Sequence, residues 1–102
     1  MLCANMRKLR KFEEYLDGAL ADPVEAANYL NAAYDEGEDV FLVALQDVAR
    51  AHGMTSLSKN TGLQREGLYK MLSKNGNPGY RSLRAILESV GLEIEFRPKK
   101  AA

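Results

Sequence analysis

Apolar residues recur every three to four positions along most of this chain, a spacing that places them on one face of an α-helix. The clearest set consists of Leu83, Ile86, Leu87 and Val90, with Gly91 following as a typical helix stop. This pattern predicts a helix that ends just before Gly91.

Three further helices are predicted in the first half of the chain. Residues 9 to 20 have apolar positions at helical spacing, which predicts a short amphipathic helix. Asp22 can cap the next helix, and Pro23 suits its first position because no amide donor is needed there; the polar DEGED segment ends this helix. Residues 40 to 52 are apolar nearly all round, which indicates a buried central helix.

One segment alternates between apolar and charged residues instead. Leu92, Ile94 and Phe96 are separated by charged side chains, which is the period of a half-buried β-strand. No other segment alternates in this way, so the strand has no partner within the chain, and a lone strand is unstable. We therefore expect these residues to pair with a second copy and to form the contact of a homodimer.

Residues 54 to 72 have the spacing of a helix-turn-helix. Ser58 is a small residue four positions before Gly62, Leu63 follows the glycine, and Leu68 and Met71 lie six and nine positions after it. In this motif the glycine supplies a left-handed turn, and the second helix enters the major groove of DNA.

The outward face of the second helix carries side chains suited to DNA, because Arg can form two hydrogen bonds with guanine and Gln with adenine. We predict base contacts from Gln64, Arg65 and Tyr69. We predict phosphate contacts from Ser56, Lys59, Lys70, Lys74, Asn75, Asn77 and Arg81. Gly67 is unexpected inside this helix, since glycine costs about 1 kcal/mol there unless close packing or the approach of DNA requires it.

Three segments of the chain resemble a known family: DPVEAANYLNAA, DVFLVALQDVARAHGMTSLSKNTGLQREGLYKMLS and GNPGYRSLRAILESVGLEI. They are similar to the probable addiction-module antidote proteins, HigA-type antitoxins with a λ-repressor-like helix-turn-helix that often occur in prophage-derived regions. The resemblance covers about residues 12 to 98, and its most specific parts are ARAHGMTSLSKNTGL and the segments LYKMLS and NGNP. It implies an antitoxin that neutralises a small ribosome-dependent mRNA-cleaving toxin and, as a dimer, represses its own operon.

The length and composition are those of one small globular domain, with 102 residues of which 46% are hydrophobic and 27% charged. No apolar run approaches the roughly 18 residues that span a bilayer, and no secretory signal opens the chain, so we expect a cytosolic protein. The expected fold is an all-α helix-turn-helix bundle of about five to six helices with one short C-terminal strand. We divide it into a helical segment (residues 1 to 21), the helix-turn-helix domain (22 to 91), and the strand and tail (92 to 102).

Few residues could carry out catalysis or bind a metal ion. The chain has one histidine and one cysteine, so a metal cage, a Cys/His nucleophile pair and a disulfide framework all lack the necessary residues. The sequence motifs of nucleotide-binding proteins and zinc proteases are absent. We therefore expect neither an enzyme nor a bound cofactor or metal.

The charges are divided between the two halves of the chain, although the formal net charge is zero. Residues 1 to 50 contain five basic and ten acidic residues, whereas residues 51 to 102 contain nine basic and four acidic ones. The basic half fits a DNA-binding face, and the acidic half fits the basic surface of an mRNA-cleaving toxin. Alternatively, the acidic residues keep the face away from DNA soluble, and the toxin contacts apolar residues such as Phe12, Tyr15 and Tyr29.

Two other functions fit the same fold. A transcriptional regulator of a prophage without a toxin would differ from an antitoxin in lacking a neighbouring gene for a small basic protein. A helical adaptor that binds only proteins would fail to retard the DNA upstream of its own gene in a gel shift.

Overall fold

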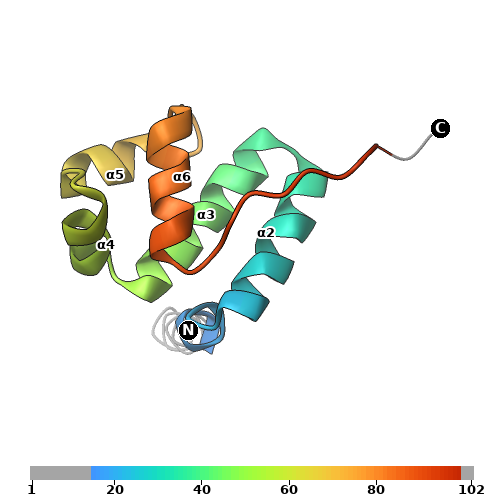
Figure 1. The fold of residues 1–102 in the computed structure, drawn as a ribbon, viewed down its shortest axis with the longest axis horizontal. Helices are drawn as coiled ribbons and strands as arrows, with labels where there is room; N and C mark the ends of the chain where they lie inside the picture. Colours follow the sequence, from blue (N-terminus) through green and yellow to red (C-terminus); the bar gives the residue numbers. More distant parts are fainter. Residues whose placement is uncertain (1–14, 100–102) are drawn as a thin grey trace, which may run out of the picture.

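The computed structural model describes residues 15 to 99, and all their regular secondary structure is helical (Figure 1). Residues 15 to 20 are helical; the rest of the helix predicted over residues 9 to 20 lies outside the described residues. The helices that follow are α2 Pro23–Glu36, α3 Glu38–His52, α4 Met54–Thr61, α5 Arg65–Met71 and α6 Tyr80–Ser89. The predicted helical class is therefore confirmed.

Helix α2 begins where its capping residues predicted. The Asp22 carboxylate accepts a hydrogen bond from the amide of Val24 at 3.1 Å, and Pro23 occupies the first helical position. Gly37, with φ of 141°, separates α2 from α3, and the two helices pack side by side. Their short connection places both ends of the acidic DEGED segment at one corner of the molecule.

Helix α3 is not buried all round, and this part of the sequence prediction is wrong. Its buried residues lie on one face, which packs against the other helices: Ala44, Leu45, Val48 and Ala49. Val40 and Val43, which lie outside this face, are 36% and 42% exposed. None of the helices between residues 15 and 99 is long and apolar enough to cross a membrane.

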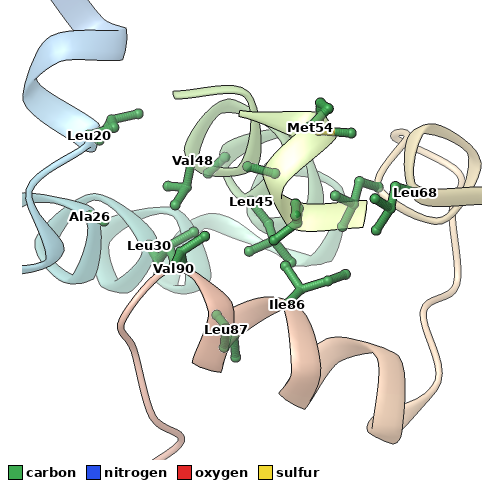
Figure 2. Close-up of a cluster of buried hydrophobic side chains, with 14 of the residues drawn as sticks. Leu20, Ala26, Leu30, Leu45, Val48, Met54, Leu68, Ile86, Leu87 and Val90 are labelled. Atoms are coloured by element: carbon green, nitrogen blue, oxygen red, sulfur yellow. The ribbon is translucent and has the colours of Figure 1, made fainter. Parts of the chain in front are cut away.

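The core joins α3, α4, α5 and α6 into one unit. Its largest fully buried side chains come from these helices and the residue after α5: Leu45, Val48, Leu57, Leu68, Leu72 and Ile86. Figure 2 shows Leu45, Leu68 and Ile86 within the same cluster, together with residues of α2 and the preceding helix. Burying a leucine side chain stabilises a fold by about 1.5–3 kcal/mol, so this cluster determines how α5 is held against its neighbours.

Helix α6 ends just before Gly91, as predicted, and Gly91 forms a left-handed turn. Gly91 has φ of 85°, its amide donates to the Glu88 carbonyl at 3.1 Å, and the Leu92 amide donates to the Leu87 carbonyl at 2.8 Å. This pair of bonds is the Schellman arrangement that satisfies the last carbonyls of a helix. In the view of Figure 1 the chain then runs past α3 and α2.

The predicted C-terminal strand is not formed, which corrects the sequence analysis. Residues 92 to 99 have no regular secondary structure, because no other extended segment between residues 15 and 99 lies beside them to share backbone hydrogen bonds. Leu92 is half-buried against the core, whereas Ile94 and Phe96 are 38% and 88% exposed. Two of the three apolar residues of this segment therefore face solvent.

Candidate nucleic-acid interface

The pair of short helices predicted around Gly62 is present as α4 and α5. Gly62 adopts the left-handed conformation, with φ of 74° and ψ of 6°, and its amide donates to the Ser58 carbonyl at 3.0 Å. A residue with a Cβ atom is strained in this conformation, so glycine is the favoured residue here. The turn occurs where the sequence placed it.

Two hydroxyl groups hold the turn, and the sequence analysis missed both roles. Ser58, considered only as a small residue, donates its Oγ hydrogen to the Leu63 carbonyl at 2.5 Å. Thr61 donates to the Leu57 carbonyl at 2.7 Å and accepts from the Leu63 amide at 3.2 Å. Backbone groups that the helices leave unpaired are thus satisfied, and the orientation of α5 relative to α4 is constrained.

Helix α5 has an inner and an outer face, as its sequence predicted. Leu68 and the following Leu72 are fully buried. All three predicted base-contacting side chains are exposed: Gln64, Arg65 and Tyr69. Gln64 precedes the helix and its side chain makes no capping hydrogen bond, so its amide group is available to an external partner.

The predicted phosphate-contacting residues are also exposed, and they come from consecutive elements. Ser56 and Lys59 lie on α4, Lys70 on α5, and Arg81 in the first turn of α6. The others, Lys74, Asn75 and Asn77, lie in the loop between α5 and α6. Because α4 packs against both α5 and α6, these elements form one side of the molecule, at the left in Figure 1.

The cationic groups on this side form no ion pairs among the described residues, and the one acidic residue on α5 is Glu66. Within residues 15 to 99 none of Lys59, Arg65, Lys70, Lys74 and Arg81 forms an ion pair. The next arginine along α6 does so, through Glu88, which lies 2.9 Å from it. The unpaired charges give this side a positive field that attracts an anionic polymer.

The loop after α5 is packed tightly against the end of that helix. A Cβ atom on Gly76 would lie 2.2 Å from the Met71 carbonyl oxygen, so only glycine fits there. The hydroxyl of Ser73 donates to the Lys70 carbonyl at 2.8 Å, and the Gly76 amide donates to the Ser73 carbonyl at 2.8 Å. The loop that carries three predicted phosphate contacts is therefore held in place by α5 itself. In the sequence, the glycine of NGN was the one sign of this close packing.

The acidic residues lie on a different part of the molecule. Asp35, Glu36, Glu38 and Asp39 are exposed at the corner between α2 and α3. Helix α2 packs on α3 and lies apart from α4 and α5 (Figure 1). Within residues 15 to 99 no group of three or more His, Cys, Asp or Glu side chains is placed to hold a metal ion.

Comparison with known proteins shows the family to which this chain belongs. A curated relative, described as an uncharacterized protein of Haemophilus influenzae (strain ATCC 51907 / DSM 11121 / KW20 / Rd), is 33% identical over 84 residues, which covers 81% of this chain and 87% of the relative. No solved structure matches the chain. The sequence model of a family described as "Probable addiction module antidote protein" matches residues 8–98, so the chain belongs to the family of probable addiction module antidote proteins.

Proposed function

We propose that this protein is the antitoxin of a toxin–antitoxin pair, that it binds DNA through α5, and that it represses its own operon as a dimer. The antidote family supports the antitoxin role. The observation that carries the DNA-binding role is the outer face of α5, where Gln64, Arg65 and Tyr69 are exposed beside cationic groups that form no ion pair within residues 15 to 99. The proposal includes what the resemblance implies, namely that the antitoxin is of the HigA type and of prophage origin.

The proposed DNA contacts divide into two classes. Arg65 and Gln64 can each form two hydrogen bonds with a purine base edge in the major groove, and Tyr69 can contact a base or a thymine methyl group. The lysines and Arg81 contact phosphates, which fixes the register of the protein on the duplex but carries no sequence information.

The dimer contact is proposed to form from the exposed segment after α6. Antiparallel pairing of two copies centred on Glu95 would place Ile94 opposite Phe96 and Glu93 opposite Arg97, so that apolar residues face each other and two pairs of opposite charges form. One pair of like charges, the two Glu95 side chains, would meet at the two-fold axis. Pairing centred on Ile94 would instead oppose Glu93 and Glu95 twice. A two-fold dimer with its α5 helices about 34 Å apart would match successive major grooves and require a palindromic operator.

The toxin contact is proposed to lie at the acidic corner between α2 and α3. A toxin that cleaves mRNA needs a basic surface for RNA phosphates, and exposed carboxylates can occupy such a surface. Asp35, Glu36, Glu38 and Asp39 are exposed there, away from α5. One chain could then bind DNA and toxin at the same time.

The test measures binding of the full chain to the DNA upstream of its own gene by fluorescence anisotropy, with shuffled DNA of equal length as control. A preference of at least 100-fold for the upstream DNA supports the repressor function, since specific binding exceeds non-specific binding by roughly 10³ or more in typical repressors. Equal affinity for both DNAs would contradict it. Rescue of cell growth on co-expression with the adjacent gene product tests the antitoxin role separately.

A further inference from the structure

Gly67 is the third residue of α5, and neither its backbone nor its packing requires a glycine. Its φ is not positive, unlike that of Gly62. Apart from its chain neighbours and the backbone of its own helix, a Cβ atom built on Gly67 would meet no atom within 4 Å, whereas one on Gly76 would overlap a carbonyl. Glycine in a helix nevertheless destabilises the fold relative to alanine. The intramolecular contacts therefore leave this glycine unexplained.

The position of Gly67 on α5 suggests what occupies the space that a side chain would fill. It lies three residues after Gln64 and three before Lys70, and residues at this spacing are neighbours on the surface of a helix. Both flanking side chains are exposed. Gly67 thus leaves a gap in the surface of α5 between a proposed base contact and a proposed phosphate contact.

We propose that Gly67 is the point where the sugar–phosphate backbone of DNA approaches the main chain of α5. This inference rests on the proposed DNA-binding function. A methyl group at Gly67 would hold the sugar–phosphate backbone roughly 1 Å or more farther from the helix. Hydrogen bonds of 2.7–3.2 Å are lost over such a displacement, so Gln64 and Lys70 would no longer reach base and phosphate together.

The variant that tests this is Gly67→Ala, and Gly18 provides a matched control. Gly18 lies in the helical residues 15 to 20, also lacks a positive φ, and also has no atom within 4 Å of a Cβ built on it. Because alanine favours a helix, we expect Gly67→Ala and Gly18→Ala each to raise the melting temperature by a few degrees. Only Gly67→Ala should weaken DNA binding, by roughly tenfold or more.

The loss for Gly67→Ala should appear on shuffled DNA as well as on upstream DNA, because every DNA sequence has the same sugar–phosphate backbone. It should be larger on upstream DNA, where the base contact of Gln64 is lost too. A more stable Gly67→Ala protein with unchanged affinity for upstream DNA would overturn the inference while leaving the proposed function intact. A lowered melting temperature would also overturn it, since the glycine would then serve the fold. If the unaltered protein shows no preference for upstream DNA, the proposed function itself fails, and the inference with it.

Discussion

The hydroxyl of Tyr29 in α2 donates a hydrogen bond to the carboxylate of Asp47 in α3 across 2.8 Å. The same carboxylate lies 3.5 Å from the guanidinium of Arg50, which also reaches Asp17 in the preceding helix at 3.3 Å. Asp47 and Arg50, neighbours on α3, thus connect this helix with α2 through Tyr29 and with the preceding helix through Asp17. This network positions the acidic part of the molecule relative to α3, and through α3 relative to α4 and α5.

Tyr29 should make the stability fall at alkaline pH. Burial, together with the hydrogen bond to Asp47 and its charge, raises the pKa of the Tyr29 hydroxyl from 10.0 to about 12. The folded state therefore favours the neutral hydroxyl, and its contribution is complete below pH 10 and is lost as the pH rises through about 12. Urea unfolding at intervals from pH 9 to 12 should show a smaller decline for Tyr29→Phe than for the unaltered protein. The same decline in both proteins would show that Tyr29 does not account for the effect; Tyr34→Phe, at a residue 72% exposed, is the control.

Ser58 should contribute to stability through its hydroxyl as well as its size. Ser58→Ala removes the hydrogen bond to the Leu63 carbonyl, and a typical loss of this kind is about 1 kcal/mol of unfolding free energy. Ser56→Ala, on the exposed side of the same helix, corrects for the higher helix propensity of alanine. Chemical denaturation of both variants gives the difference between their free energies of unfolding. Equal stability of the two variants would show that the Ser58 hydrogen bond has no net effect.

Arg65 and Lys74 should affect DNA binding in different ways. Arg65→Ala should cost roughly 1–3 kcal/mol on the operator and little on random DNA, because it removes a base contact. Lys74→Ala should weaken both and reduce the slope of log affinity against log salt by about one, because it removes a phosphate contact. Anisotropy titrations at several salt concentrations measure these effects. Equal losses for Arg65→Ala on both DNAs would exclude it from base recognition.

The segment after Leu92 should be required for the dimer but not for the fold. Leu92 is half-buried against the core and its amide caps α6, so the truncation should end at this residue. We expect the truncated protein to keep its helical circular dichroism and to sediment as a monomer. A chain that ends at Arg97 retains Ile94 and Phe96 and should remain a dimer. Dimers of both proteins would show that the contact lies elsewhere, on a packed helix face.

Charge reversal at the acidic corner should weaken toxin binding without harming the fold. Asp35 and Glu36 lie in the last turn of α2, where positive charge is favoured by the helix dipole, so a variant with lysine at both positions should fold. It should associate more slowly with the toxin at low salt and bind the operator as before. Glu66→Lys is the control for the toxin measurement alone, because it changes charge away from this corner but on α5, the proposed DNA-binding helix. Unchanged toxin kinetics across ionic strength would place the toxin contact on apolar surface instead.

The positions of several helix ends and of the central turn could be predicted from the sequence because they depend on local interactions. Asp22 and Pro23 start α2, and Gly62 and Gly91 adopt the left-handed turns that glycine favours. The hydrogen bonds at these positions join residues no more than five apart in the chain. The exposure of the candidate DNA-contacting residues on α5 could also be predicted from the sequence, because the buried Leu68 determines which side of this helix faces outward.

Tertiary structure decided what depends on residues distant in the chain. Helical periodicity could not show that Val40 and Val43 lie uncovered on α3, since this depends on which helices pack around it. Nor could it pair Tyr29 with Asp47, eighteen residues later. The alternation of residues 92 to 97 predicted a strand, but a strand requires a neighbouring strand for its backbone hydrogen bonds. Residues 15 to 99 of one chain supply none, so the alternating pattern could not produce regular structure within a single molecule.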